Sequence, residues 1–484
     1  MKLKIKSGEK SVTSIKNNSV FEKKSLDSIY NEIQKVYLSD SKPWIIGYSG
    51  GKDSTTILQL IWYALAKLPK KNLHKKVHVI SSNTLVESPF LIKMATESIK
   101  KINVASRIQK LPLSAEHVMP EINNSFWVNI LGRGYPAPTK TFRWCTDRLK
   151  IQPADKYIID KVAYHGDVIV VLGVRKDESA TRAQAMNLYK IKNSLLSRHS
   201  KYPQAFVYAP ISDFSTDDVW SYLLQKKNPW GMNNRDLLAM YKNPDDTECP
   251  LVVDKTTTSC GNSRFGCWTC TVVKKDKSLQ NLIDQGNDWM IPLLELRDFL
   301  YKTTLPETKH EYRDFRGRNG HVRMKSNGTG ISRGPYKLSF LKILLEKILQ
   351  AQKKINKMAP EEKFKLILPK ELYLIREMWV REKGDWSDSL PKIYSEIMGT
   401  DLDWIDNDWG LFSFEEKTIL DKICLNENIS TELIVSLLDA ERNIQGMTKR
   451  STALNKIDKI LRKEWRSEKE VLKTMVQGDL NDHK

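Results

Sequence analysis

The stretch Trp44-Ile45-Ile46-Gly47-Tyr48-Ser49-Gly50-Gly51-Lys52-Asp53-Ser54 decides the fold of this chain. It begins as an apolar run, and after the paired glycines a helical pattern of apolar residues follows at Ile57, Leu58, Ile61 and Leu65. A strand that ends in glycines and opens into a helix bares backbone N–H groups at the positive end of the helix dipole, where phosphate oxygens bind. The sequence therefore predicts a triphosphate site at Ser49, Gly50, Gly51, Lys52, Asp53 and Ser54. The plainer alternative is a Gly-Gly turn followed by an exposed lysine.

This motif is not a Walker A loop, because Asp53 stands where that loop needs Ser or Thr after the lysine. The hexapeptide resembles the signature of the PP-loop ATP pyrophosphatase family. The resemblance implies that the loop holds the β,γ-pyrophosphate of ATP while a substrate oxygen attacks the α-phosphorus and forms an adenylate. It also implies that Mg2+ accompanies ATP and that Lys52 and Asp53 act in catalysis.

Around the loop, short apolar runs alternate with helical stretches from about residue 41 to 225. Strands are expected at 44–48, 77–81, 104–111, 168–172 and 206–210, and helices near 54–67, 88–102, 153–164 and 216–225. Such alternation favours an α/β fold of the PP-loop (adenine nucleotide α-hydrolase-like) type, with a parallel sheet covered by helices on both faces. In such a sheet the ligand lies beyond the carboxyl ends of the strands.

The chain divides by pattern into five parts. We expect an N-terminal arm and helix (1–40), a PP-loop ATP pyrophosphatase domain (41–225), a cysteine-rich iron-sulfur segment (226–290), a basic loop region (291–337) and a helical C-terminal region (338–484).

Composition indicates a polyanionic partner. Lys and Arg number 78 against 58 acidic residues, a formal net charge of +20 with a pI near 9.4. A generally lysine-rich proteome would give the same excess. The mean hydropathy is −0.46, no segment approaches the roughly 20 apolar residues that cross a bilayer, and the start Met1–Lys6 is too polar for a signal peptide. We therefore expect a cytoplasmic protein.

Two further strand ends carry candidate nucleotide-binding residues. After the second strand, Asn83 and Thr84 would face the adenosine half of the nucleotide, as the PP-loop resemblance implies, or they are ordinary strand-end caps. After the fourth strand, Gly173 permits close approach of a ligand, and Arg175 offers a planar fork to phosphate oxygens. We expect Arg175 to act in catalysis as well.

Six cysteines are too few for a disulfide framework, and four of them lie within 22 residues: Cys249, Cys260, Cys267 and Cys270. Their spacing, C-x10-C-x6-C-x2-C, fits neither the common zinc-finger nor the ferredoxin pattern. Neighbouring glycines could offer N–H groups to cluster sulfides, and Trp268 could shield a redox centre. These features favour a [4Fe-4S] cluster over structural zinc or unmetallated thiols.

Cys145 stands apart, in the turn Arg143-Trp144-Cys145-Thr146. It is predicted to act in catalysis as a persulfide acceptor, or to be an alternative cluster ligand. Flanking Arg143 and Arg148 are expected to lower its pKa. A half-buried core cysteine is the alternative.

The Arg143–Thr146 turn, the stretch Leu172-Gly173-Val174-Arg175, the segment 210–223 and the PP-loop together resemble the PAPS reductase branch of the PP-loop family. Those reductases carry a reactive cysteine near the C-terminus, whereas the last cysteine here is Cys424 within a helical pattern. PAPS reduction is therefore disfavoured.

With the four-cysteine segment and the basic stretches near 312–337, the pattern from about residue 20 to 350 resembles the DndC family of PP-loop proteins. This resemblance implies an ATP pyrophosphatase that activates a DNA backbone phosphate so that sulfur replaces a non-bridging oxygen. The implied partners are DNA, DndD- and DndE-like subunits and a cysteine desulfurase as sulfur donor. Arg316, Arg318, Arg323 and Arg333 are the expected DNA contacts.

Two alternative functions are also compatible with the sequence. One is an iron-sulfur-dependent tRNA thiolase that uses the same adenylation chemistry, and the other is a non-catalytic subunit that binds nucleotide and DNA.

Overall fold

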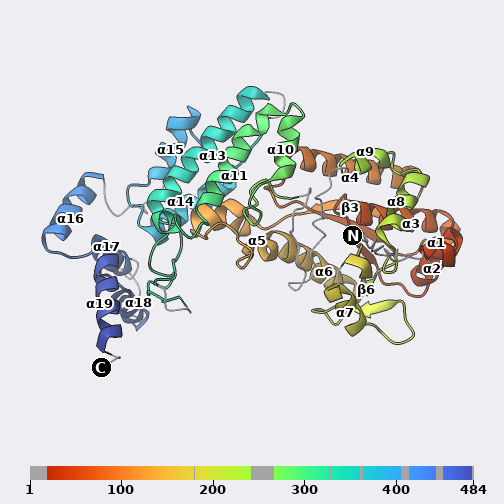
Figure 1. Ribbon diagram of the computed structural model, residues 1–484, viewed down its shortest axis with the longest axis horizontal. Coiled ribbons are helices and arrows are strands. Elements are labelled where there is room, and N and C mark those ends of the chain that lie inside the picture. Colours follow the sequence, from red (N-terminus) through yellow and green to blue (C-terminus); the bar gives the residue numbers. More distant parts are fainter. Residues whose placement is uncertain are drawn as a thin grey trace, which may run out of the picture. The chain divides into compact units, whose positions relative to one another are not determined.

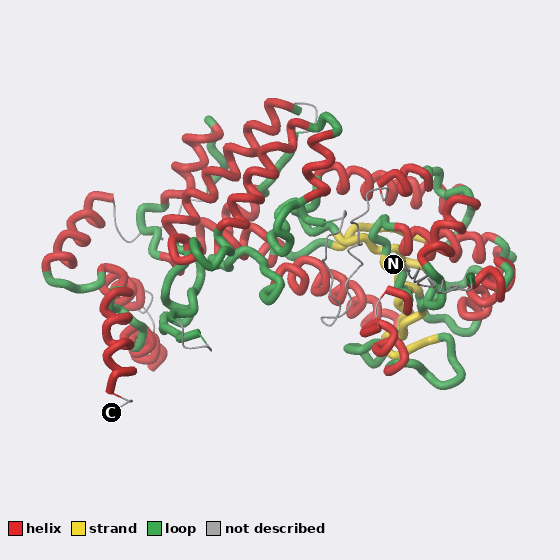
Figure 2. Tube along the Cα trace, in the orientation of Figure 1, coloured by secondary structure: helices red, strands yellow, loops and turns green. Residues whose placement is uncertain are grey.

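The computed structural model describes residues 19–178, 180–240, 266–325, 330–359, 363–404, 414–442 and 451–481 (Figures 1 and 2). Their contacts define two compact units. The first contains the described residues up to Ser82, Lys93–Val118 and those from Ala154 to 240; the second contains Asn83–Ile92, Met119–Pro153 and those from 266 onward. The two units are interleaved along the chain, whereas the five-part division expected from the sequence follows chain order and stays a prediction.

A six-stranded sheet of order β3-β2-β1-β4-β6-β5 forms the centre of the first unit. Its strands are β1 Trp44–Gly47, β2 Val77–Ser82, β3 Leu113–Val118, β4 Val168–Val171, β5 Leu196–Arg198 and β6 Ala205–Tyr208. All neighbours pair in parallel except β5, which runs antiparallel to β6 at the edge. In the central register, Trp44 lies between Val77 and Ile169. This arrangement confirms the predicted α/β fold with a mostly parallel sheet.

Helices cover both faces of the sheet (Figure 1). The helices whose greater part belongs to this unit are α1 Val20–Lys23, α2 Leu26–Leu38, α3 Lys52–Ala66, α4 Pro89–Ile108, α6 Gln152–His165, α7 Ala180–Leu188, α8 Thr216–Gln225 and α9 Asn234–Met240. On one face, Ile158 of α6 packs with Ile45 and Val170. Adjacent residues of a strand point to opposite faces, so Trp44 meets Tyr37 of α2 on the other face, with ring centroids 5.5 Å apart.

The third strand predicted from the sequence, 104–111, is wrong. The helix α4 continues to Ile108, and Val104 and Ile108 are 48% and 75% exposed. The chain leaves the helix through Lys110, at φ +53°, and β3 begins only after Pro112. The apolar residues near the exposed end of this helix imitate the pattern of a strand. The short edge strand β5 was missed because three residues carry too little pattern.

The second unit is mainly helical, which confirms the predicted helical C-terminal region. Its helices are α5 Trp144–Thr146, α10 Lys277–Asp284, α11 Ile291–Lys302, α12 Lys309–Tyr312, α13 Leu338–Met358, α14 Pro369–Lys383, α15 Ser389–Met398, α16 Phe414–Asn426, α17 Thr431–Arg442, α18 Ser451–Leu461 and α19 Glu468–Asn481, with π-helical turns at Val128–Gly132 and Asp147–Ile151. One continuous apolar core joins α11, α13, α14 and α15 to the turns around Trp127 and Trp268. Among the described residues, no helix combines the length and apolarity that a membrane crossing needs.

Candidate functional site

The predicted phosphate loop joins β1 to α3. Gly50 has φ +78°, a left-handed conformation that a side chain would disfavour, and Gly51 occupies the N-cap of α3 with no side-chain capping bond. The hydroxyl of Ser54 donates to the carbonyl of Gly51 at 3.1 Å, and the N–H of Ser49 donates to Ser54 Oγ at 3.3 Å. The loop is therefore folded on itself, and the N-terminus of α3 is suited to an anion.

Asp53 connects the two cations of this site. Its Oδ1 lies 2.6 Å from Arg175 Nε, and its Oδ2 lies 3.0 Å from Lys52 Nζ. The side chains of Asp53 and Arg175 are 5% and 4% exposed, so this ion pair is nearly dry. Arg175 also donates to Thr216 Oγ1 at 3.2 Å, and Glu178 Oε1 lies 3.9 Å from Arg175 Nε. Lys52 and Asp53, which the sequence predicts to act in catalysis, thus form one charged cluster with Arg175.

Gly173 is where the end of β4 meets the start of α3. A Cβ atom built on it would stand 3.3 Å from both the carbonyl carbon of Asp53 and the nitrogen of Ser54. A side chain here would require the strand and the loop to move apart by a few tenths of an ångström. The structure therefore brings together Ser49–Ser54, Gly173 and Arg175, as a nucleotide site of this kind requires.

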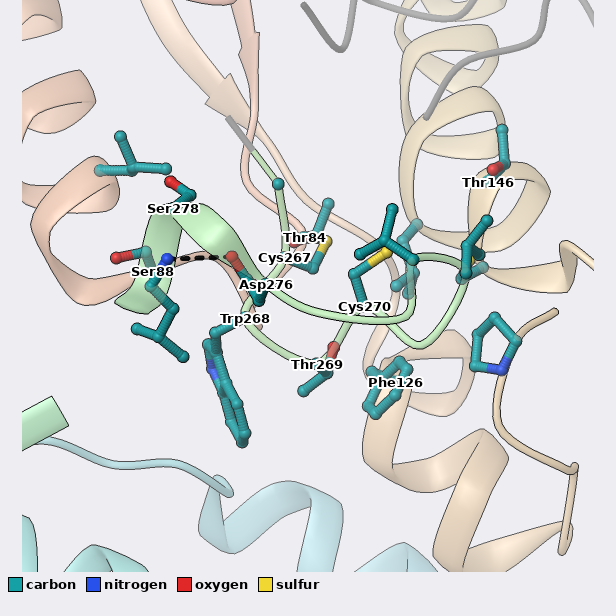
Figure 3. Close-up of a pocket in the computed structure, with 18 of the residues that line it drawn as sticks. Thr84, Ser88, Phe126, Thr146, Cys267, Trp268, Thr269, Cys270, Asp276 and Ser278 are labelled. Carbon is teal, nitrogen blue, oxygen red and sulfur yellow. Dashed lines mark hydrogen bonds between the residues drawn. The ribbon is translucent and has the colours of Figure 1, made fainter. Parts of the chain in front are cut away.

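The second unit contains a cavity of about 110 Å³ lined by three cysteines, Cys145, Cys267 and Cys270. Figure 3 shows Cys267 and Cys270 among the lining residues. Thr84 lines it too, with its Oγ1 3.3 Å from Cys267 Sγ. This contact arises because the chain beside Thr84 pairs with the cysteine turn, where the N–H of Trp268 donates to the carbonyl of Val86 at 3.1 Å.

Thr84 therefore lies beside a cysteine, while Asn83 accepts the N–H of Leu85 at 2.9 Å and caps its own turn. Both residues belong to the second unit. Their part in nucleotide binding stays a prediction.

Burial dominates the acidity of the thiols. It raises the pKa of Cys145 to about 11 and that of Cys267 to about 12. The charge of Cys270 contributes to the high pKa of Cys145, and the charge of Cys145 contributes to that of Cys267. The expectation that Arg143 and Arg148 would lower the pKa of Cys145 is wrong. Arg148 donates instead to Asn124 and, at 3.2 Å, to the hydroxyl of Tyr135.

A buried arginine fixes the chain that follows the cysteines. Arg297 of α11 is fully buried, and its guanidinium donates to the carbonyls of Cys270 at 2.9 Å, Lys274 at 2.8 Å and Val273. Thr271 adds a hydrogen bond from its hydroxyl to the carbonyl of Pro138 at 2.6 Å. The position of Cys270 is therefore set by α11 as well as by its own loop.

The donor set has the chemistry of a soft-metal or iron-sulfur site, because thiolates are the ligands that such groups prefer. Cys249 and Cys260, the other two predicted ligands, lie outside the described residues. Within the described part of the chain, no three or more His, Cys, Asp or Glu side chains stand at metal-binding separations. The thiols present thus fit an iron-sulfur cluster or a soft metal by donor type. Cys267, Cys270 and Cys145 are the described residues that could contribute to holding such a group.

The four arginines predicted to contact DNA differ in the partners of their guanidinium groups. Arg316 lies 3.1 Å from Asp314 Oδ2 and 2.8 Å from Glu432 Oε2, and Arg333 lies 2.5 Å from Glu468 Oε1, so both are neutralised within the chain. Arg318, which is exposed, donates to the hydroxyl of Tyr135 at 3.0 Å. Arg323 is exposed as well.

Several site residues were not singled out from the sequence. Glu178 follows Arg175 by three residues, a spacing that could have suggested it. Glu87 forms an isolated antiparallel β-bridge with Cys267, and burial raises the pKa of its carboxyl group. Arg297 fixes the cysteine turn. Neither carries a local signal, because each acts on a segment far away in the sequence.

The fold and the loop define a PP-loop nucleotide-utilising domain. The family model of the phosphoadenosine phosphosulfate reductase domain matches residues 43–273, slightly less than half of the chain, so this part of the chain is similar to that domain. This match covers the PP-loop, Cys145, Arg175 and all four clustered cysteines.

Among curated proteins, the chain is 27% identical over 213 residues to the uncharacterized protein MJ0066 of Methanocaldococcus jannaschii. The match covers 43% of this chain and 36% of that relative, so the chain spans little more than a third of the relative's length.

Solved structures with distant likeness include the U34-tRNA thiolase NcsA of Methanococcus maripaludis with its [4Fe-4S] cluster, at 14% identity and a TM-score of 0.28 over 59% of this chain and 82% of that one. The FMN adenylyltransferase of Candida glabrata has 13% identity and a TM-score of 0.25 over 44% of this chain and 59% of that one. The NH3-dependent NAD synthetase of Campylobacter jejuni has 10% identity and a TM-score of 0.27 over 59% of this chain and 94% of that one. Likeness at this level assigns no activity.

Proposed function

We propose that residues 49–54 bind ATP and that the protein splits it to AMP and pyrophosphate in order to activate a DNA backbone phosphate for sulfur insertion. The observation that carries the ATP half is the cluster at the N-terminus of α3, where Asp53 holds Lys52 and Arg175 beside a glycine loop. The DNA half rests on the net charge of +20 and on the sequence resemblance to the DndC family.

The chemistry requires activation because a non-bridging phosphate oxygen is a poor leaving group. Attack by that oxygen on the α-phosphorus of ATP forms a P–O–P bond to AMP and breaks the bond to pyrophosphate. A hydrosulfide then attacks the DNA phosphorus, and AMP departs with the original oxygen. Where the sulfur arrives as a persulfide, a reducing thiol attacks the inner sulfur, releases that hydrosulfide and ends in a disulfide with the cysteine that carried it.

The chain's own residues have defined parts in the first step. Lys52 and the N-terminus of α3 stabilise the negative charge of the departing pyrophosphate. Asp53 holds Arg175 and Lys52 in place, and the planar guanidinium of Arg175 orients a phosphate. Mg2+, when bound with ATP, supplies further neutralisation of the phosphate oxygens.

In this proposal Cys267 and Cys270 hold a [4Fe-4S] cluster together with Cys249 and Cys260. Cys145, which lines the same cavity as Cys267 and Cys270, is an alternative ligand or a persulfide acceptor. The bound cluster supplies sulfur-handling chemistry. The proposed partners are DNA, DndD- and DndE-like subunits and a cysteine desulfurase that provides the sulfur.

A turnover assay on the purified full chain tests the ATP half. AMP and pyrophosphate are measured by chromatography after incubation with ATP, Mg2+ and duplex DNA. The Lys52→Ala variant should lose AMP formation, whereas Lys67→Ala, which removes a half-exposed lysine at the other end of α3, should keep it. Nucleotide binding by the wild type without AMP would establish the non-catalytic alternative.

A second experiment tests the substrate. The gene is deleted in its host, and nuclease digests of DNA and tRNA are analysed by mass spectrometry. Loss of phosphorothioate-linked dinucleotides, restored by the wild type but not by Lys52→Ala, supports the proposal. Loss of a tRNA thionucleoside alone would replace DNA by tRNA as the substrate.

A further inference from the structure

Two arginines of the second unit converge on Tyr135. Arg148 and Arg318 both donate to its hydroxyl, at 3.2 and 3.0 Å. The same two guanidiniums lie 5.5 and 5.2 Å from the centre of its ring. One phenol thus gathers two cations from segments that are distant in the sequence.

Arg133 brings a third cation to the same place. Burial lowers its pKa, and the positive charges of Arg148 and Arg318 lower it further. It donates to the carbonyl of Asn123 and, at 3.3 Å, to Asn129 Oδ1, which are neutral groups. Glu382 is near enough to favour its charge but forms no ion pair with it.

Lys383, at the end of α14, is a fourth cation nearby. Its pKa is lowered to about 8, mainly by burial and in part by the charge of Arg318, while Glu382 and Asp314 act in the opposite direction. Its Nζ would stand 2.8 Å from a Cβ built on Gly134, the residue between Arg133 and Tyr135. With φ +71°, Gly134 makes the turn that presents its two neighbours.

The acids described near this group act on it at a distance: Glu382 on Arg133 and Lys383, and Asp314 on Lys383. No ion pair joins Arg133, Arg148 or Arg318 to an acid within the described residues, whereas Arg316 and Arg333 are neutralised by acids in the same unit. Like charges gathered without a counter-charge destabilise the fold, and an anion binding among them removes that cost. Guanidinium forks match the oxygens of phosphate, and several together favour a phosphate over a single carboxylate.

The surroundings of these arginines indicate that the phosphate belongs to a polymer. Arg318 is exposed, Arg133, Arg148 and Tyr135 are half-buried, and Phe142, with its ring centroid 6.4 Å from that of Tyr135, is 45% exposed. Exposed aromatic rings beside arginines are typical of surfaces that bind a nucleic-acid strand, because bases stack on the rings while the cations bind the backbone.

We infer that Arg133, Arg148 and Arg318 bind a backbone phosphate of a nucleic-acid strand. The inference deepens the proposed function and rests on it for the identity of that strand as DNA. It moves the main phosphate contact away from Arg316 and Arg333, and it adds two arginines that the sequence did not single out for binding.

Fluorescence anisotropy with labelled duplex DNA, single-stranded DNA and RNA of the same sequence tests the inference on the full chain over a range of salt concentrations. Arg133→Gln and Arg148→Gln should each weaken binding by about tenfold, as expected for one charge-assisted hydrogen bond. Each should also reduce the slope of log affinity against log salt by about 0.7 to 0.9, since one phosphate contact is lost. Arg148→Lys should keep the slope and recover part of the affinity.

Arg381→Gln is the matched control, because it removes an exposed arginine of α14 that is paired with Glu377. Circular dichroism of every variant verifies folding. Wild-type affinity and slope in Arg133→Gln and Arg148→Gln would overturn the inference. A weakening seen with RNA alone would uphold the phosphate site and refute DNA as the strand, and a wild type that binds DNA without producing AMP would refute the proposed function but not this site.

Discussion

The ion pair between Asp53 and Arg175 gives the sharpest quantitative prediction. Replacing Arg175 by Met removes a guanidinium that is 4% exposed and lies 2.6 Å from a carboxylate that is 5% exposed. Breaking a buried pair in this way destabilises a protein by about 3–5 kcal/mol, because the remaining charge is left without compensation. Asp53 keeps Lys52 at 3.0 Å, so we expect the lower end, about 3 kcal/mol.

For a unit of this size, that loss corresponds to a fall in melting temperature of about 6–12 °C. Differential scanning calorimetry and urea unfolding of the full chain measure it. Arg107→Met serves as the control, since it removes an exposed arginine of α4 in the same unit and should change the free energy of unfolding by less than about 0.5 kcal/mol.

A double-mutant cycle with Asp53→Asn separates the interaction energy of Asp53 and Arg175 from other effects of the two substitutions on stability. The two substitutions together should be less destabilising than the sum of the single ones, with a coupling energy of about 2 kcal/mol. Additive effects, or an Arg175→Met variant that is as stable as the wild type, would refute the view that Asp53 needs this partner.

Three further predictions concern the rest of the chain. Cys267→Ser should reduce the iron content and the visible absorbance of the protein purified without oxygen, whereas Cys424→Ser, in α16, should change neither; unaltered iron in the first variant would remove Cys267 from the ligand set. Arg297→Met should release the cysteine turn and lower the free energy of unfolding by about 3 kcal/mol or more, because hydrogen bonds from a buried cation to three carbonyls are lost. The release is measured as faster proteolysis near residue 272. An unchanged cleavage rate would contradict the role of Arg297 in fixing this turn. Burial lowers the pKa of His78 to about 4. Between about pH 6.5 and 4 the unfolded chain therefore binds a proton that the folded chain does not, and the free energy of unfolding falls with falling pH by up to about 3 kcal/mol. Urea titrations should show this slope in the wild type and a shallower one in His78→Asn.

Local patterns were sufficient for the phosphate loop. The strand, the paired glycines and the helix are contiguous between Trp44 and Ala66, so short-range sterics and apolar periodicity specify them together. The same reasoning failed at α4, where Val104 and Ile108 are apolar but exposed, and burial is a property of the fold that a single chain segment does not encode.

The partners in the two sites were decided at longer range. The sequence pointed to Asp53 and Arg175 separately, and the parallel pairing of β1 with β4 is what brings the ends of their strands together. The sequence predicts Cys145 as a persulfide acceptor or an alternative cluster ligand, and the fold places it in the lining of one cavity with Cys267 and Cys270. The high pKa of Cys145 follows from its burial, which outweighs the opposing charge of Lys150.

By itself, the sequence determined the α/β class, the loop at Ser49–Ser54 and the excess of positive charge, because each depends on neighbouring residues or on simple counting. Only the tertiary structure decided which charges are neutralised. Arg316 and Arg333 have acids brought to them by the fold, while Arg133, Arg148 and Arg318 gather around Tyr135. The Coulomb energy of a charge depends on distances through space, and those distances exist only once the chain has folded.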